Sequence, residues 1–368
     1  MNSKEMLLNL YRNKPCAGIP LAAYLFFAGR EYFLPIGKIE RTIRDLGMLY
    51  IQPRSPYITE VRNVEIETKT ERIPINGKEQ SKLCPEVTTR VYHTPAGDIS
   101  EKFRANLAYG TSNWVLEHLI KKPSDYRVLK YILENSTYHE NYEAIRQAQD
   151  DLGEDGIVYA AVDRSPLQKL IVEWAGIERF CLDYYDYRNT VQELLLVVQQ
   201  EQETLCRIAA SSPAKVIWSP DNVTEDITTP KLFNKYLVPF YNKQAKLFHK
   251  HKKIYAVHLD GKLKHLAGLI SKTDIDVVES FTLPEGGGNL PLKEALKAWK
   301  GKTIAANIPA FLALHNSEFV KQYINGLKEK INYQDNFSLQ YSEDLPRSGT
   351  GLTKTLLTIA SALYRGNG

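Results

Sequence analysis

Between residues 215 and 281 the chain alternates short apolar runs with longer stretches of helical periodicity. The apolar runs cover 216–218, 254–257 and 275–278, and each one stops at polar residues. Short runs rich in β-branched and aromatic residues are typical of buried strands, and helices between them predict parallel pairing. Polar residues at the ends of such strands are typical of the catalytic rim of a barrel enzyme. The pattern therefore indicates both a fold class and the region of a site.

The same texture extends through most of the chain. Helical patterns at 38–46, 190–210, 317–330 and 352–364 separate further apolar runs, which we interpret as strands 19–27, 47–52, 156–162, 303–306 and 337–341. Together with the three runs above they make eight parallel-type strands. Eight strands in this order favour a (β/α)₈ TIM barrel over an open doubly wound sheet. We predict one barrel domain over residues 1–368.

Residues 57–103 have a different pattern. Val64 to Thr68 alternates apolar and polar side chains, and a Thr-Pro-Ala-Gly turn begins at Thr94. Period-two alternation with turn residues predicts antiparallel strands with one solvated face. We interpret 57–103 as an antiparallel β insertion in the N-terminal third, outside the barrel. Helices are predicted to follow at 113–120, 123–135 and 139–151.

Composition narrows the partners and the compartment. The 368 residues carry a net charge of only +4, which does not favour nucleic acid or an anionic membrane surface as a partner. The longest apolar stretch, near 19–29, is too short to span a bilayer. The four cysteines are scattered, so we expect reduced thiols and a cytoplasmic protein. They are Cys16, Cys84, Cys181 and Cys206.

Polar residues at the predicted carboxyl ends of the strands form the candidate site. These ends surround one mouth in a barrel, so the side chains are expected to converge there. Any one of them could instead cap the next helix or bond a loop amide. The set is Arg30, Gln52, Arg164, Asp221, Asn222, His258, Asp260, Glu279, Asn307 and Glu343.

His258 is the most informative member of that set. It directly ends an apolar run, and Asp260 follows two residues later, so both side chains can face the same way. Helix capping requires no imidazole, which favours a functional interpretation. The alternative is a histidine that bonds a carbonyl of a neighbouring strand.

Several short motifs in the second half of the chain occur together in a known family. They are Asp221-Asn222, Thr229-Pro230-Lys-Leu-Phe, Leu237-Val-Pro239-Phe-Tyr, His258-Leu-Asp260-Gly261 and Ile275-Asp276. With these motifs the chain resembles the uroporphyrinogen decarboxylase (URO-D) superfamily, most clearly over 150–350. The resemblance implies a (β/α)₈ barrel and one of two chemistries. One is decarboxylation of a tetrapyrrole, and the other is zinc-dependent methyl transfer that involves a corrinoid protein.

The decarboxylases of this family carry Arg-Gln-Ala-Gly-Arg-Tyr-Leu-Pro after the first strand. Here the loop keeps its second arginine as Arg30, but Phe26 replaces the first. Gln52 stands where the decarboxylases have an aspartate, and no histidine follows His315 to match their last-strand histidine. A substrate with many carboxylates binds less well when guanidinium groups are lost. These departures count against uroporphyrinogen decarboxylation.

The methyltransferases of the family use His-x-Cys on the strand that matches 257–260, and a further Cys after the last strand. His258 is retained, Asp260 replaces the first Cys, and the second falls near Glu343. Zinc accepts carboxylates as well as thiolates. The resemblance thus implies Zn²⁺ held by His258, Asp260 and Glu343, although such a nitrogen and oxygen set could take another divalent ion.

The leading hypothesis is metal-assisted methyl transfer between a small-molecule substrate and a corrinoid supplied by a partner protein. The expected catalytic residues are His258, Asp260, Asp221 and Asn222, and the expected substrate-binding residues are Arg30, Arg164, Glu279 and Asn307. One alternative is a decarboxylase of a tetrapyrrole or related acid that uses Arg30 and Arg164 as anchors. Another is a non-catalytic ligand-binding barrel. If the ligand hypothesis holds, the tips of His258, Asp260 and Glu343 lie within about 6 Å of one another.

Overall fold

The structure is a computed structural model of the whole chain. It describes residues 2–14, 18–24, 38–72, 86–105, 113–332, 336–342 and 350–364. The chain divides into two compact units. The first consists of Met1–Pro56, Asn141–Val162 and Ala209–Gly368, and the second of Tyr57–Glu140 and Asp163–Ile208.

The first unit contains a closed barrel of eight parallel strands, which confirms the predicted fold class. Around the barrel the strand order is β1-β14-β13-β12-β11-β10-β9-β2. The strands are β1 (Leu21–Tyr24), β2 (Leu49–Arg54), β9 (Gly156–Ala161), β10 (Val216–Ser219), β11 (Ile254–His258), β12 (Val277–Phe281), β13 (Thr303–Asn307) and β14 (Phe337–Tyr341). Nearly every residue of these strands is buried, as expected for a parallel sheet covered on both faces.

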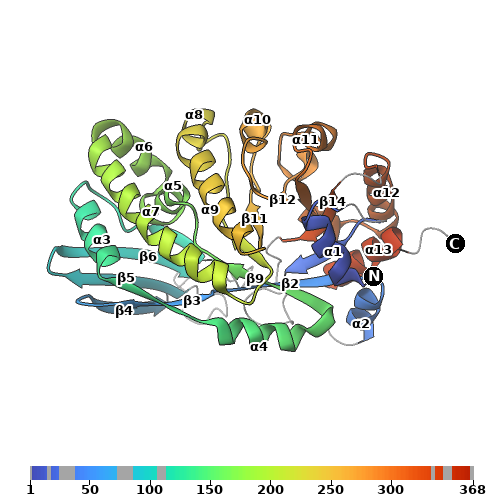
Figure 1. The fold of residues 1–368 in the computed structure, drawn as a ribbon, viewed down its shortest axis with the longest axis horizontal. Coiled ribbons are helices and arrows are strands. Elements are labelled where there is room, and N and C mark those ends of the chain that lie inside the picture. The colour runs from blue at the N-terminus through green and yellow to red at the C-terminus, as the bar shows by residue number, and fades with distance from the viewer. Residues whose placement is uncertain are drawn as a thin grey trace. The chain divides into compact units, whose positions relative to one another are not determined.

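Helices α9 to α13 of the first unit lie outside strands β11, β12 and β14 (Figure 1). Pro239 is the second residue of α9, which follows the π-helix η5 without a break, so the hydrogen-bond pattern of the helix changes just before this proline. The described helices of this unit are α1 (Ser3–Tyr11), α2 (Lys38–Asp45), α4 (Tyr142–Leu152), α8 (Pro230–Leu232), α9 (Val238–Lys250), α10 (Ala267–Ile270), α11 (Leu292–Ala298), α12 (Ser317–Lys328) and α13 (Thr350–Tyr364), with a π-helix η5 (Phe233–Leu237) and 3-10 turns η3 (Gly153–Asp155), η6 (Lys264–Leu266), η7 (Pro284–Gly286) and η8 (Ala310–Leu314).

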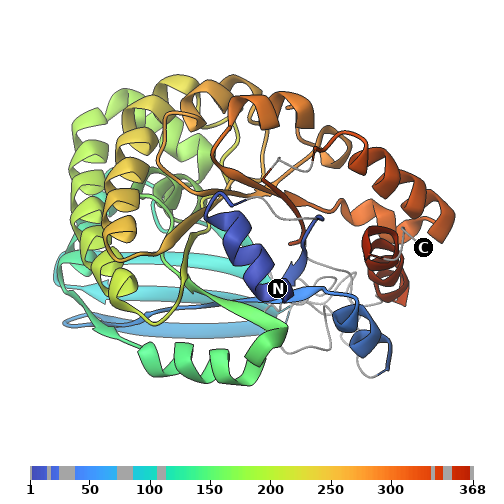
Figure 2. The same ribbon diagram turned by 45° about the vertical axis from the view of Figure 1, so that its right-hand side comes forward.

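Helix α1 packs against the inward-facing side chains of the strands, and Figure 2 shows it in dark blue inside the arc of outer helices. Its side chains Leu7, Leu8, Leu10 and Tyr11 belong to one apolar cluster with alternate residues of the barrel strands. The hydroxyls of Tyr11 and Tyr159 lie 2.8 Å apart within this cluster. Alternation along each strand then assigns the next inward positions to Trp218, His258 and Glu279.

The second unit contains two antiparallel sheets, which confirms that 57–103 supplies antiparallel strands outside the barrel. One sheet pairs β3 (Tyr57–Val61) with β8 (Ser136–Glu140). The other has the order β4-β5-β6-β7. Its strands are β4 (Glu65–Arg72), β5 (Glu86–Thr94), β6 (Gly97–Ala105) and β7 (Asn113–Glu117), and the helices of the unit are α3 (Asp125–Glu134), α5 (Pro166–Lys169), α6 (Gly176–Asp186) and α7 (Arg188–Ser211), with a π-helix η4 (Leu170–Ala175).

Three predicted elements differ from the structure. The expected helix at 113–120 is wrong, because 113–117 forms strand β7 on the edge of the sheet. The helix expected from 139 begins at Tyr142, after strand β8. The strand expected at 275–278 covers 277–281 instead. In each case the local sequence pattern suggested one element, and pairing with another strand set the observed one. None of the described helices is long and apolar enough to cross a membrane.

Candidate functional site

Strand β12 has an irregular register at the centre of the candidate site. We expected Glu279 to end the strand, but the strand continues to Phe281, with a register shift between Glu279 and Phe281. Ser280, inside this bulge, has a φ of +57°. A β-bulge re-aims the side chains of its strand. Here Glu279 keeps its inward position next to His258, its partner on β11.

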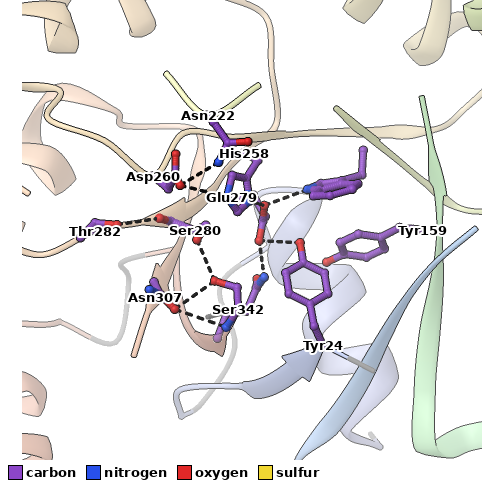
Figure 3. Close-up of polar contacts among 12 residues, drawn as sticks. Tyr24, Tyr159, Asn222, His258, Asp260, Glu279, Ser280, Thr282, Asn307 and Ser342 are labelled. Carbon is purple, nitrogen blue, oxygen red and sulfur yellow. Dashed lines mark hydrogen bonds and ion pairs between the residues drawn. The ribbon is translucent and has the colours of Figure 1, made fainter. Parts of the chain in front are cut away.

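The Glu279 side chain is fully buried and accepts four hydrogen bonds. Its Oε1 accepts from Tyr24 Oη at 2.7 Å and from Gln340 Nε2. Its Oε2 lies 2.8 Å from Trp218 Nε1 and 2.6 Å from His258 Nδ1. Figure 3 shows these groups converging on one carboxyl group. Four partners on two oxygens satisfy the acceptor capacity of an ionised carboxylate, so Glu279 is a fixed anion in the barrel.

His258 lies between Glu279 and Asp260. Its Nδ1 faces Glu279, and its Nε2 lies 3.4 Å from Asp260 Oδ2. Burial by itself would lower the pKa of His258, but the two carboxylates outweigh it and raise this pKa to about 10. Burial likewise opposes the ionisation of Asp260, yet His258 and Asn222 together lower its pKa. Without further ligands the pair is thus an imidazolium beside a carboxylate.

A chain of neutral polar groups lies next to this pair (Figure 3). The hydroxyls of Ser280 and Ser342 are 2.7 Å apart, and Ser342 Oγ donates to Asn307 Oδ1 at 2.9 Å. Thr282 Oγ1 donates to the Ser280 carbonyl. The chain joins β12, β13 and β14 at their carboxyl ends. It supplies hydroxyl and amide groups without adding charge, which suits a polar substrate.

Backbone strain marks the two strand ends that flank His258. Asn222, which follows β10, has a φ of +51°, and Ser280 has +57°. Such conformations cost about 1 kcal/mol or more for non-glycine residues. The strain has a visible consequence at Asn222, because its amide N–H bonds the His258 carbonyl and its Nδ2 donates to Asp260 at 2.8 Å. Asn222 thereby holds both ends of the His258–Asp260 segment.

Among the other expected site residues, Asp221 and Arg164 have hydrogen-bond or ion-pair partners of their own. Asp221 is fully buried and accepts hydrogen bonds from Tyr241 and Ser219, so it braces the end of β10. Arg164 belongs to the second unit, where its Nε pairs with Glu173 Oε1 at 3.0 Å. Arg30 and Glu343 lie outside the described residues, and the distance expectation for Glu343 stays a prediction.

Sequence reasoning missed three groups that bond Glu279. Tyr24 and Trp218 resemble ordinary apolar strand residues, and Gln340 lies inside a predicted strand. The sequence did contain one indication, the alternation of inward and outward side chains along each strand. Tyr24, Trp218 and Gln340 each share a face with inward-facing positions two residues earlier, and all three carry a polar end.

Within the described ranges no group of three or more His, Cys, Asp or Glu side chains is arranged to hold a metal ion. His258 and Asp260 nevertheless fit as two ligands. Two ligands of a tetrahedral zinc ion, each about 2 Å from it, lie roughly 3.3 Å apart. The separation of His258 Nε2 and Asp260 Oδ2 is 3.4 Å. Glu279 on Nδ1 then occupies the position of the carboxylate that commonly orients a ligating histidine.

Comparisons with known proteins relate the chain to others by fold alone. No protein-family model and no curated protein matches the chain. Among solved structures, a methyltransferase from Methanosarcina mazei is similar at a TM-score of 0.50 with 12% identity, over 72% of this chain and 76% of that one. Dispersin B aligns over 72% of this chain and 80% of its own with 10% identity, and its TM-score of 0.32 is too low to indicate a shared fold. The chain therefore shares the barrel fold of the methyltransferase.

Proposed function

We propose that this protein is a barrel enzyme that binds a divalent cation, zinc first, through His258 and Asp260 and transfers a methyl group between a small substrate and a corrinoid protein. The observation that carries the proposal is the His258 geometry, with Nδ1 on Glu279 at 2.6 Å and Nε2 3.4 Å from Asp260. Nδ1 is fixed by a buried carboxylate, and Nε2 and Asp260 lie at the separation of two ligands of one ion.

Charge supports a cation at this place. Glu279 and Asp260 contribute two negative charges, and His258 must release its Nε2 proton to bind a metal and is then neutral, so the three groups sum to −2. A cation bound to His258 and Asp260 complements that sum, whereas an added carboxylate opposes it. A bound zinc ion would act as a Lewis acid or hold a substrate thiol as thiolate.

The chain's own residues then have separate tasks. Glu279 orients the imidazole, and Tyr24, Trp218 and Gln340 hold Glu279 in place. Asn222 fixes the Asp260 carboxylate. Asn307, Ser280 and Ser342, which bond one another, would exchange some of these bonds for hydrogen bonds to the heteroatom that carries the methyl group.

A tetrapyrrole decarboxylase remains the second candidate, because a protonated His258 could donate a proton to a carbanion after loss of carbon dioxide. In that hypothesis Arg30 and Arg164 bind the carboxylates of the substrate. Arg164 Nε already pairs with Glu173, which weakens that assignment.

Metal analysis after zinc loading and exhaustive dialysis tests the proposal. The wild type is expected to retain one equivalent of zinc, and His258→Ala and Asp260→Asn to retain little. His249→Ala is the matched control, because His249 also pairs with a carboxylate, Asp276, at 2.9 Å. Equal zinc retention by the wild type and His258→Ala would contradict the proposal.

Activity separates methyl transfer from the alternatives. The zinc-loaded protein is incubated with corrinoid and a panel of methylated amines, ethers and thioethers, and the visible spectrum of the corrinoid reports gain or loss of a methyl group. His258→Ala should abolish the change and His249→Ala should keep it. Release of carbon dioxide from a polycarboxylate by metal-free protein would support the decarboxylase instead. Zinc binding without either reaction would support a ligand-binding barrel.

A further inference from the structure

Three neighbouring loops follow strands β10, β11 and β12 at their carboxyl ends. They cover residues 220–229, 259–266 and 282–291. The first loop carries Asn222 and the second carries Asp260, and the Asn222 side chain donates to the Asp260 carboxylate at 2.8 Å (Figure 3). Loops are usually more mobile than the elements that they connect. A metal ligand on a loop therefore depends on the contacts that hold the loop in place.

The first two loops lie side by side and are joined by main-chain hydrogen bonds. Gly261 N donates to the Val223 carbonyl at 3.1 Å, and Glu225 N donates to the Lys262 carbonyl at 2.9 Å. A Cβ atom added at Gly261 would lie 2.4 Å from the Val223 carbonyl oxygen, so the two backbones approach too closely for any side chain. Asp260 directly precedes this close contact. The position of its carboxylate thus depends on how the two loops are held together.

The Glu225 side chain joins all three loops. It is only 8% exposed, and it accepts a hydrogen bond from His265 N at 2.6 Å. His265 Nδ1 lies 2.9 Å from the same carboxylate, and Asn289 Nδ2 in the third loop donates to it at 2.7 Å. Burial opposes the ionisation of Glu225, but these bonds outweigh it and lower its pKa. One carboxylate on the first loop therefore binds groups of the second and the third.

Asn289 joins the third loop to the second as well as to Glu225. Its Oδ1 accepts hydrogen bonds from Leu263 N at 2.9 Å and from Lys264 N at 3.1 Å. Both oxygen and nitrogen of this amide are thus used, one toward the second loop and the other toward the first. Glu225 and Asn289 together form a hydrogen-bonded connection across the three loops, on the side of the second loop that follows Asp260.

We infer that Glu225, with Asn289 as its partner, is a positioning residue for Asp260 that holds the loop 259–266 in the place required for metal binding. The inference rests on the proposed function, because it assigns the Asp260 carboxylate to a metal ion. Glu225 acts through the main chain of the loop and not by binding the ion. Hydrogen-bonded groups behind metal ligands typically change metal affinity by about 10–100-fold. Loss of Glu225 should therefore weaken zinc binding and leave the barrel folded.

Zinc dissociation constants, measured in competition with a chromophoric chelator, test the inference. Glu225→Ala removes the acceptor of all three side-chain bonds and should weaken zinc binding about tenfold or more. Glu225→Gln keeps one acceptor oxygen and should recover part of that loss. Asp226→Asn is the matched control, because Asp226 is the adjacent carboxylate, pairs with Lys262 at 2.9 Å and is 57% exposed. It should leave the dissociation constant unchanged, and thermal melting of the metal-free proteins checks that every variant folds.

Two further measurements separate positioning from a general structural role. Co²⁺ is bound in place of zinc, and its visible absorption spectrum depends on the geometry of its ligands. Glu225→Ala should change that spectrum, whereas Asp226→Asn should keep the spectrum of the wild type. Hydrogen exchange of the metal-free proteins, followed by mass spectrometry, should become faster in the peptide 259–266 of Glu225→Ala and stay the same in Asp226→Asn.

The outcomes distinguish a failure of the inference from a failure of the proposed function. A wild type that retains no zinc would contradict the proposed function, and the inference with it. If the wild type binds zinc and Glu225→Ala binds it equally well, the proposed function stands and the inference is overturned. An equal loss of affinity in Asp226→Asn, or a weaker affinity of Glu225→Ala with an unchanged Co²⁺ spectrum, would also overturn it.

Discussion

The barrel unit contains two histidine–carboxylate pairs beside the same strand, and they differ mainly in burial. At the amino end of β12, His249 Nε2 lies 2.9 Å from Asp276. Farther along β12, His258 Nδ1 lies 2.6 Å from Glu279. The His249 side chain is 42% exposed, whereas that of His258 is 11% exposed and Glu279 is fully buried.

The pKa of the histidine is raised in both pairs, but the causes differ. A hydrogen bond to Asp276 is the main cause at His249, where solvent moderates every charge. At His258 burial opposes the charge and two carboxylates overcome it, which raises the pKa to about 10. An exposed pair contributes little to stability, but a buried pair that loses one partner leaves an uncompensated charge. The two pairs have the same chemistry, so burial is the reason that losing one partner should cost more at His258–Glu279 than at His249–Asp276.

Glu279→Gln is expected to have the largest effect on that comparison. It leaves His258 without its main counter-charge and places an amide among four donors, so the free energy of unfolding should fall by about 3–5 kcal/mol. Asp276→Asn, the equivalent change in the exposed pair, should cost about 1 kcal/mol or less. Urea unfolding measures both. Equal losses would mean that burial does not separate the two pairs.

The pH dependence of stability should also separate them. An unfolded histidine has a pKa of about 6.5. Because His258 in the folded, metal-free protein has a pKa raised to about 10, its contribution is fully present below about pH 6.5 and is lost as pH rises toward 10. The difference in unfolding free energy between the wild type and His258→Gln should therefore narrow by a few kcal/mol over that range. A constant difference would contradict an imidazolium at this position.

Tyr24→Phe should give an intermediate effect. It removes one hydrogen bond to the buried Glu279 carboxylate, and a bond to a charged group is worth about 1.5–3 kcal/mol. Tyr11→Phe removes a bond between two neutral hydroxyls inside the same barrel and should cost about 1 kcal/mol. Thermal or urea unfolding compares the two. A larger loss at Tyr11 would indicate that the Glu279 network tolerates a missing donor.

His249→Ala is expected to have the smallest effect. The pair is half in solvent, so the loss should be about 0.5 kcal/mol, within the range of exposed ion pairs. Added salt should reduce even that difference, because screening acts mainly on exposed charges. A loss as large as that of Glu279→Gln, or one that salt leaves unchanged, would reverse the ranking of the two pairs.

The barrel could be predicted from the amino-acid sequence. Apolar runs separated by helical patterns are set by the chain's own periodicity, and burial of parallel strands on both faces leaves few other folds. The sequence also predicted that His258 and Asp260 face the same way, and their side chains lie 3.4 Å apart. Alternation along 57–103 was likewise enough to predict antiparallel strands. These features depend on local spacing, which a single sequence contains.

The surroundings of His258 depend on contacts between distant segments, which form only in the folded chain. Glu279 was expected at a strand end as a substrate-binding residue, but β12 continues to Phe281 and Glu279 lies buried beside His258. Its donors Tyr24, Trp218 and Gln340 come from β1, β10 and β14, so no local pattern relates them. Strand β7 was mistaken for a helix for the same reason, since its identity depends on pairing with β6. Contacts between distant segments are fixed by barrel closure and strand register. Neither can be derived from the periodicity of a single sequence, which reports only local spacing.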